Sequence, residues 1–338
     1  MLGVIIVIGN VSYGESRITQ LWFLTSEFLT PNFVLWKIYL YCMHLTILNR
    51  KTLDEIPSAS GIEIIGDKLF IMGDDSPWLF KLDDCFEIEG KIQITDILPD
   101  SGNKIAKALK PDLEAMAFIE LNGHNELFLF GSGSKSPERD VLIRVNVDHL
   151  HAVKKHSLVE FYKNLRNALG LTKDEINIEA AAVLSKNLYL FNRGKNKVVR
   201  VNMNDFISYL EGNEAIPSFE FFSVKLPALN GREAGFSGAT CIPDSQQIIF
   251  TASIENTLNW IDDGEILGSF LGTFSVTTLK NSFAPDCIVI KDDQNNTSKI
   301  KVESVAVRRR ISADCFQLCL VTDNDSATSE IIEAELKL

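Results

Sequence analysis

Cysteine and histidine are scarce in this chain of 338 residues, with six cysteines and five histidines. The cysteines are Cys42, Cys85, Cys241, Cys287, Cys315 and Cys319. No two of them form a CxxC pair, and no histidine follows at zinc-finger spacing, so the common structural zinc sites are excluded. We therefore expect free, buried thiols, as in a reducing compartment.

Basic residues are also in the minority. Lysine and arginine number 33 against 45 aspartates and glutamates, which gives a net charge of -12. A nucleic-acid-binding protein needs a basic surface to displace the counterions of the phosphates, so the composition excludes that class of protein. The hydrophobic content of 46% and charged content of 23% are those of an ordinary globular protein.

Motifs that would name a reaction are absent as well. No GxSxG sequence is present, which excludes the usual α/β-hydrolase triad. The sequence "GSGSKS", from Gly131, looks like a phosphate-binding loop, but it joins two expected strands, whereas a P-loop leads into a helix. The acidic segments "DGEILG" and "DNDSATSE" do not have EF-hand spacing. Function must therefore be argued from how residues converge in the fold.

The chain has no long uninterrupted apolar run. Its N-terminal region is apolar and aromatic, but Glu27, Pro31 and Lys37 interrupt it, whereas a membrane helix needs about 20 apolar residues. The segment "VSYGES" is a poor signal-peptidase site. We expect residues 1–42 to be a poorly ordered extension or the result of a translation start assigned too early, with no stable membrane insertion. The protein is then cytoplasmic, or periplasmic if this segment acts as a signal.

The chain does contain an internal repeat. Five segments combine a polar second residue with small or apolar residues: "ASGIEI" at Ala59, "LEAMAF" at Leu113, "IEAAAV" at Ile178, "FSGATC" at Phe236 and "VESVAV" at Val302. Their second residues are Ser60, Glu114, Glu179, Ser237 and Glu303, which are 54, 65, 58 and 66 positions apart. Each segment precedes a turn and a hydrophobic strand, and usually a third, alternating strand. This pattern indicates an antiparallel all-β chain.

Each interval has room for one four-stranded sheet and its loops, so we predict an all-β fold, a β-propeller of five four-stranded blades. The last repeat has only three strands, and "MHLTILNR", from Met43, supplies a spare strand that would complete it and close the ring. Six blades are the alternative and would need a further repeat in the 237–303 interval. We expect residues 43–338 to form this one domain, as a monomer, with a helical insertion around residues 149–170.

The polar second residues of the repeat are expected at one mouth of the propeller channel. In a blade the inner strand begins at the face where the antiparallel second strand ends. Crowding at the axis explains the small residues of the inner strands but not the glutamates. The ends of the second strands and the loops that follow add further polar residues to this mouth: Asp74, Asp75, Ser132, Ser134, Asn192, Arg193, Ser253, Glu255, Asp323, Asp325, Lys135, Arg139 and Lys195.

Three glutamates near one axis repel one another and need protons, basic neighbours or a bound cation, for which Ca²⁺ or Mg²⁺ suits carboxylates better than zinc. We therefore predict catalytic roles for Glu114, Glu179 and Glu303. The predicted metal ligands are Glu114, Glu179, Glu303, Asp74 and Asp323. The predicted substrate-binding residues are Arg193, Lys135, Arg139, Ser60, Ser237 and Asn192. The alternative is that each glutamate accepts hydrogen bonds from backbone amides and ties adjacent blades together.

The segments "LEAMAF", "INIEAAAVLSKNLYLFNRG" and "FSGATCIPD" resemble an uncharacterised group of bacterial β-propeller proteins over about residues 44–338, and more distantly the phytase-like and esterase-like propellers. Phytase-like propellers bind phosphate esters with calcium ions at an acidic channel mouth. The resemblance therefore implies calcium as a cofactor and Glu114, Glu179 and Glu303 as acids of that mouth. Two of the five ring positions are Ser60 and Ser237 instead of acids, and the dense aspartate clusters of a calcium phytase are missing.

Two functions stay open at this point. The first is a metal-assisted phosphate-ester or ester hydrolase, with its site at the channel mouth and a small anionic molecule or ester as substrate. The second is a non-catalytic propeller that binds a ligand, a sugar or a protein at the same rim. Propellers host both kinds of function, so the fold cannot decide whether the protein is an enzyme.

Overall fold

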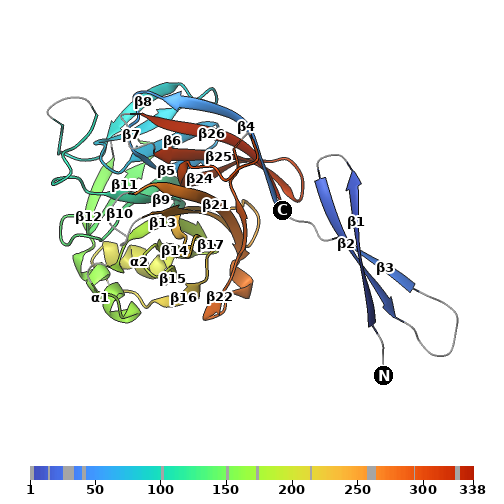
Figure 1. Ribbon diagram of the computed structural model, residues 1–338. Helices are drawn as coiled ribbons and strands as arrows, with labels where there is room; N and C mark the ends of the chain where they lie inside the picture. Colours follow the sequence, from blue (N-terminus) through green and yellow to red (C-terminus); the bar gives the residue numbers. More distant parts are fainter. Residues whose placement is uncertain are drawn as a thin grey trace. The chain divides into compact units, whose positions relative to one another are not determined.

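The computed structural model describes residues 4–13, 16–25, 34–39, 43–99, 103–149, 152–172, 175–213, 215–256, 264–292, 294–323 and 328–338. The chain divides into two compact units, Met1–His44 with Lys337–Leu338 and Leu45–Leu336. The larger unit contains the blades of the propeller (Figure 1). None of the helices in the described ranges is long and apolar enough to cross a membrane.

Five sheets, each with four antiparallel strands that follow one another outward, form the larger unit. The innermost strand of each sheet starts at one of the repeated segments. From the inside outward, blade 1 contains β5 (Ala59–Ile65), β6 (Lys68–Gly73), β7 (Trp78–Leu82) and β8 (Ile88–Gln93), and blade 2 contains β9 (Leu113–Leu121), β10 (His124–Gly131), β11 (Val141–Asn146) and β12 (Val153–Ser157). Blade 3 contains β13 (Ile178–Leu184), β14 (Asn187–Asn192), β15 (Lys197–Asn202) and β16 (Glu220–Val224), and blade 4 contains β19 (Gly235–Cys241), β20 (Gln247–Glu255), β21 (Ile266–Ser275) and β23 (Asp286–Val289). Blade 5 contains β24 (Lys301–Arg310), β25 (Cys315–Asp323), β26 (Ser329–Lys337) and β4 (His44–Leu53). The predicted five-bladed propeller is confirmed.

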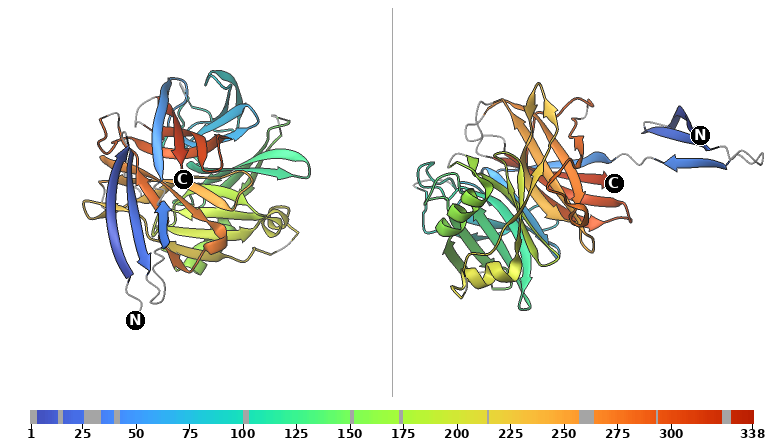
Figure 2. Two further views of the ribbon diagram at one scale, coloured as in Figure 1. Left: turned by 90° about the vertical axis from the view of Figure 1, so that its right-hand side faces the viewer. Right: turned by 90° about the horizontal axis from the view of Figure 1, so that it is seen from below.

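Blade 5 takes its outer strand from the beginning of the propeller sequence. Strand β4 lies next to β26 in the sheet order, and in Figures 1 and 2 the blue ribbon of β4 runs among the red strands of the C-terminal end. The spare strand predicted from "MHLTILNR" therefore closes the ring. The interval between Ser237 and Glu303 contains the four strands of blade 4, so the fold does not use the six-blade alternative.

Two shorter pairings complete the sheets of the larger unit. Strand β22 (Ser282–Phe283), from the connection between β21 and β23, pairs in parallel with β16 and covers the outer edge of blade 3. Strands β17 (Ala228–Leu229) and β18 (Arg232–Glu233) form a small hairpin before blade 4. The pairing covers the end of the outer edge of blade 3, at Ser223 and Val224, and leaves fewer backbone groups there for another chain.

The insertion between blades 2 and 3 is helical only in its second half. Residues Val153–Ser157 pair with β11 as the outer strand of blade 2, and α1 extends over Val159–Leu169. The helix predicted around residues 149–170 is therefore shorter than expected, because the preceding residues satisfy the backbone edge of β11 instead. Aromatic side chains of α1 pack against those of α2 (Met203–Leu210), and the two helices lie next to each other in Figure 1.

The start of every inner strand contains a β-bulge. In each blade the second residue of the repeated segment has no partner in the neighbouring strand, while the residues on both sides of it are paired. A bulge adds one residue to one strand and re-aims its side chain out of the regular alternation. The bulged residues are Ser60, Glu114, Glu179, Ser237 and Glu303. The repeated polar residue therefore marks a repeated backbone irregularity.

Hydrogen bonds join each blade to the next near the channel axis. The Ser60 hydroxyl donates to the Leu113 carbonyl of blade 2, and the Ser237 hydroxyl of blade 4 donates to the Val302 carbonyl of blade 5, both at 2.6 Å. Blades 2 and 3 are joined by a bond from the Ile178 amide to the Ser132 carbonyl, and blades 3 and 4 by one from the Asn196 side chain to the Ala234 carbonyl. Blades 5 and 1 are joined by a bond from the Ile62 amide to the Ser304 hydroxyl. The bulged serines thus hold neighbouring blades together.

The apolar cores of the propeller lie between adjacent blades, where buried side chains from neighbouring sheets pack together. The inner strands approach one another much more closely. A Cβ atom added to Gly238 would lie 2.5 Å from the Ser304 Cα atom and 2.8 Å from the Glu303 carbonyl oxygen. This crowding is why the inner strands are rich in small residues.

The smaller unit contains one antiparallel sheet in the order β1 (Val4–Tyr13), β2 (Ser16–Thr25) and β3 (Val34–Tyr39). Strands β1 and β2 pair along their full length from Val4–Thr25 to Tyr13–Ser16. The expectation that residues 1–42 are a poorly ordered extension stays a prediction.

We expect Gly238→Ala to lower the free energy of unfolding by about 1–3 kcal/mol, since the new methyl group meets the backbone of blade 5. The matched control is Gly90→Ala, because a Cβ at Gly90 has no atom within 4 Å. Urea denaturation followed by circular dichroism gives both values. Equal midpoints for the two variants would contradict close packing between blades 4 and 5.

Candidate functional site at the channel mouth

The bulges bring charged side chains from different blades to one end of the channel, which we call the channel mouth. The charges of Glu114, Glu179 and Glu303 all act on the guanidinium of Arg193, so the three glutamates of the repeat surround a common region. Two sets of ion pairs make up this mouth. We call them the Lys110 group (Asp74, Lys110, Asp112 and Arg139) and the Arg193 group (Glu179, Arg193, Glu255, Lys301 and Glu303).

The Lys110 group lies at the junction of blades 1 and 2. The Lys110 ammonium contacts Asp74 Oδ2 and lies 2.8 Å from Asp112 Oδ1. On its other oxygen, Asp112 accepts a hydrogen bond from Arg139 at 2.6 Å and one from the Ser132 hydroxyl at 2.5 Å. Asp74 Oδ1 is buried and has no hydrogen-bond partner. Both oxygens of Asp112 therefore have partners, whereas only Oδ2 of Asp74 has one.

Glu114 lies beside this group without a partner. Among the residues that the structure describes, none donates a hydrogen bond to its carboxyl group or forms an ion pair with it. Burial, followed by repulsion from Asp112, Asp74 and Glu179, raises the pKa of Glu114 well above its usual value. This shift favours the protonated form of the carboxyl group, and a cation bound in place of the proton would relieve the same repulsion.

The Arg193 group links blades 3, 4 and 5. The Arg193 guanidinium lies 2.7 Å from Glu255 and 3.7 Å from Glu179, and Lys301 lies 3.3 Å from Glu255 and 2.8 Å from Glu303. The chain of alternating charges gives each acid a basic partner, which comes from another blade or the adjacent strand end for Glu255 and Glu179 and from the same strand, β24, for Glu303. Burial raises the pKa of Glu303 to about 7, although Lys301 opposes the shift. Gly235 makes room for this arrangement, because a Cβ there would lie 2.5 Å from Arg193 Cγ.

Three predicted substrate-binding residues face the protein rather than the mouth. Asn192 is fully buried, and its side chain accepts a hydrogen bond from the Asn177 amide at 2.7 Å and donates one to the Glu175 carbonyl at 3.0 Å. Ser60 and Ser237 bond to carbonyls of the next blade, as described above. Their hydroxyl and amide groups position the inner strands.

The other predicted residues are spread around the mouth. Arg139 and Arg193 are engaged in ion pairs, whereas Lys135 is exposed and lies 3.7 Å from Glu138. Asp323 stands opposite Lys301 in the β24–β25 ladder. Asp325 lies outside the described residues.

Sequence reasoning missed Lys110, Asp112 and Lys301. A signal was present for two of them, because Asp112, Asn177 and Lys301 each precede a bulged glutamate by two positions, a spacing that recurs in three repeats. The Asn177 amide group donates to Glu179 at 2.5 Å, and Lys301 pairs with Glu303. Lys110 gave no such signal, because it lies on the irregular connection before β9 and reaches the site through its loop conformation.

Three carboxylates of the mouth meet the requirement for a shared cation. Asp74, Asp112 and Glu114 each offer an oxygen within 4.8 Å of the other two. Calcium binds oxygens at about 2.3–2.6 Å, so three oxygens at this spacing can contact one ion. Of the five predicted metal ligands, Asp74 and Glu114 belong to this set, while Glu179 and Glu303 belong to the Arg193 group. The set fits a hard divalent cation.

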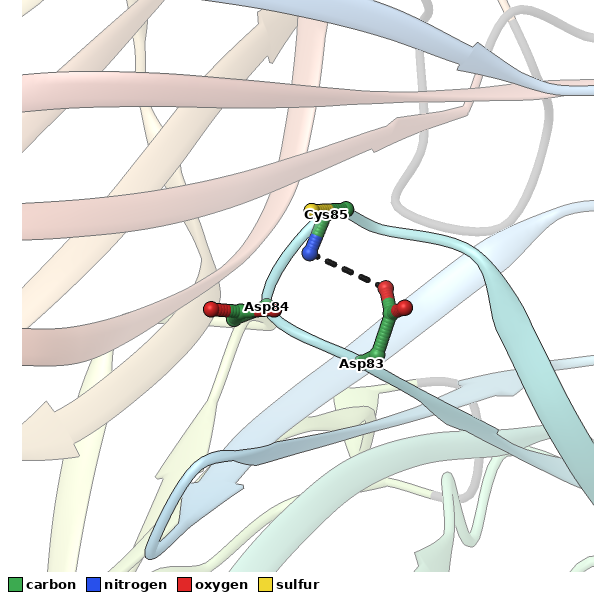
Figure 3. A group of neighbouring side chains, drawn as sticks. All are labelled: Asp83, Asp84 and Cys85. Atoms are coloured by element: carbon green, nitrogen blue, oxygen red, sulfur yellow. Dashed lines mark hydrogen bonds between the residues drawn. The ribbon is translucent and has the colours of Figure 1, made fainter.

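A second acidic set lies on the turn between β7 and β8. Asp83, Asp84 and Cys85 are close in space (Figure 3). Asp83 Oδ1 accepts hydrogen bonds from the Cys85 amide at 2.9 Å and from the Glu87 amide at 2.8 Å, so this carboxylate closes the turn. Cys85 is an exposed free thiol, and Cys319 is the fully buried one among the described cysteines. The set has a local structural role.

Fold and site together define a five-bladed β-propeller with a buried, charged channel mouth. The sequence matches a family of unknown function, DUF6929, over residues 55–336, and the chain belongs to that family. The match covers blades 1 to 4 and strands β24, β25 and β26 of blade 5 up to residue 336, and it begins after β4. A search of curated proteins gives no match to this chain.

Solved structures similar to this chain have varied functions. Glutaminyl cyclase from Myxococcus xanthus has 9% identity and a TM-score of 0.46, over 87% of this chain and 96% of that one. The PQQ-bound aldose sugar dehydrogenase from Streptomyces coelicolor has 12% identity and a TM-score of 0.43, over 87% and 98%. Hydrazine synthase from Kuenenia stuttgartiensis has 11% identity and a TM-score of 0.39, over 80% of this chain and 58% of that one. The chain thus spans less than two thirds of the hydrazine synthase chain.

We expect Arg193→Met to lower the free energy of unfolding by about 3–5 kcal/mol, since it leaves buried Glu179 without its cation and leaves Glu255 with Lys301 as its remaining base. The control is Arg200→Met on the same blade, which removes an exposed pair with Glu220 and should cost less than about 1 kcal/mol. Urea denaturation measures both. Similar losses would show that the Arg193 group does not hold the blades together.

Glu63, on inner strand β5, gives a prediction on pH. Its carboxylate accepts a hydrogen bond from the Phe118 amide at 3.3 Å, and burial raises its pKa from 4.5 to about 8. Between those two values the folded protein binds more protons than the unfolded chain, so this group makes stability fall as pH rises. We expect Glu63→Gln to match wild type near pH 4.5 and to exceed it near pH 8. The exposed Glu120→Gln is the control in urea melts across this range, and parallel curves for all three proteins would contradict the assignment.

Proposed function

We propose that the protein is a hydrolase of phosphate esters or carboxylic esters that works at the channel mouth. Glu114 is the acid–base residue, and Asp74, Asp112 and Glu114 hold a divalent cation, calcium by preference. The observation that carries the proposal is the carboxyl group of Glu114, which lies beside two other carboxylates without a partner of its own. Groups with strongly shifted pKa values and no structural bond are typical of functional sites.

The chain supplies proton transfer at this site. The oxygen of the Glu114 carboxylate that does not hold the cation accepts a proton from the attacking water and then donates this proton to the leaving oxygen of the ester. This exchange returns Glu114 to its starting state and commonly contributes about 10²–10⁴ in rate. A bound cation would polarise the ester or phosphoryl oxygen.

Substrate binding in this proposal depends on the exposed base of the mouth. Arg139 and Arg193 are neutralised by buried acids, whereas the pair between Lys135 and Glu138 is exposed on both sides and therefore weak. Lys135 is free to exchange Glu138 for an anionic substrate. We therefore assign Lys135 to substrate binding, and Arg139 and Arg193 to holding the acids in place.

A combined binding and activity experiment tests the proposal. We expect CaCl₂ to raise the melting temperature of wild type more than that of Glu114→Gln, because a ligand of the folded state stabilises it. We also expect Glu114→Gln to lower kcat on p-nitrophenyl acetate or p-nitrophenyl phosphate by about 100-fold. The control is Asp84→Asn, which alters the exposed acidic turn and should behave as wild type in both assays.

The second candidate function is a non-catalytic binding module. The internal ion pairs of the Arg193 group favour it, because acids that are already neutralised serve as a rigid rim rather than as reacting groups. A calcium-dependent rise in melting temperature without turnover would support this function. Absence of both effects in wild type would contradict the cation-assisted hydrolase.

A further inference from the structure

Lys110 occupies the place where a bound cation would make its contacts. Its ammonium group touches Asp74 and lies 2.8 Å from Asp112 Oδ1. These are two of the three carboxylates whose oxygens lie within 4.8 Å of one another. The remaining oxygen of Asp112 is used by Arg139 and Ser132. A divalent cation and Lys110 therefore require the same oxygen of Asp112.

The two acids and the lysine are held with different rigidity. Asp74 directly follows β6, the second strand of blade 1, and Asp112 directly precedes β9, the inner strand of blade 2, so both backbones are held by strands of adjacent blades. Lys110 belongs to the irregular connection between β8 and β9, where its amide bonds to the Ala106 carbonyl. Its side chain is a flexible four-carbon stem that can move its charge without moving a strand.

The unpaired atoms of the group show what Lys110 leaves unsatisfied. The lysine approaches Asp74 through Oδ2, while Asp74 Oδ1 is buried without a hydrogen-bond partner. The charge of Lys110 acts on Glu114 without forming an ion pair with it in the part of the chain that the structure describes. One positive charge thus serves two of three clustered acids. A doubly charged ion in its place would neutralise the set more completely.

We propose that Lys110 is a tethered cation that competes with a divalent ion for Asp74 and Asp112 and so sets the affinity of the channel mouth for that ion. This inference rests on the proposed cation site. When the ion binds, the lysine swings out toward solvent, and when the ion leaves, the lysine returns and prevents two buried aspartates from facing each other uncompensated.

Isothermal titration calorimetry of the full chain with CaCl₂ tests the competition. Lys110→Met keeps the length of the side chain and removes its charge, and we expect it to bind calcium about tenfold more tightly or better, because no internal cation opposes the ion. The matched control is Lys104→Met, since Lys104 lies 3.4 Å from Asp75 in the same part of the mouth but contacts none of the three ligands. Its affinity should stay within about twofold of wild type.

Each outcome has a distinct meaning. Tighter binding by Lys110→Met alone supports the inference, and if wild type binds no calcium at all, the same result also shows that the lysine keeps the site closed. Equal or weaker binding by Lys110→Met, with calcium binding by wild type, overturns the inference and leaves the proposed function standing. No binding by any of the three proteins overturns both.

Thermal melting is the second measurement, and it applies if the substitutions at Lys110 destabilise the protein. Without its lysine the pair of aspartates repels, so Lys110→Met and Lys110→Gln are expected to melt at a lower temperature than wild type. Calcium should then raise their melting temperatures more than it raises that of wild type. If neither variant folds alone, refolding in CaCl₂ replaces the titration, and failure to recover folded protein under that condition overturns the inference.

Discussion

Crowding at the channel axis is the constraint on which the rest of this structure depends. Five inner strands converge there, and each begins with a bulge that removes one residue from the backbone ladder. A bulged side chain leaves the regular alternation of the strand and turns toward its neighbours. Glycines such as Gly61 and Gly238 stand where adjacent inner strands approach too closely for a side chain. The repeated β-bulge therefore accounts for both the close packing of the inner strands and the polar side chains at the channel mouth.

What each bulged residue does depends on its length and charge. Ser60 and Ser237 are short, reach the carbonyl of the next inner strand and hold two blades together. Glu179 and Glu303 are longer and enter ion pairs with bases from their own and other strands. Glu114 is left over, because the base in its neighbourhood serves two aspartates. Its incomplete bonding distinguishes Glu114 from the other four bulged residues.

The spacing of five similar segments was enough to predict the blades, because each blade must restart at the axis with the same crowded strand. The alternating residues after Met43 likewise predicted the closing strand β4. The helix before blade 3 was predicted too long, since the sequence VKKHS reads as helical while β11 needed an outer partner. At the site, Glu114, Glu179 and Glu303 were found from the repeat, and Lys110 was missed because no periodicity describes a loop.

By itself, the sequence determined the number of blades, the strand that closes the ring and the convergence of three glutamates on one mouth. These features follow from local patterns of polarity and size, which repeat along the chain. Only the tertiary structure decided which acids are neutralised and by which bases. That outcome depends on distances between residues far apart in the sequence, such as Arg193 and Glu255, and on burial, which raises the pKa of a carboxyl group that finds no partner.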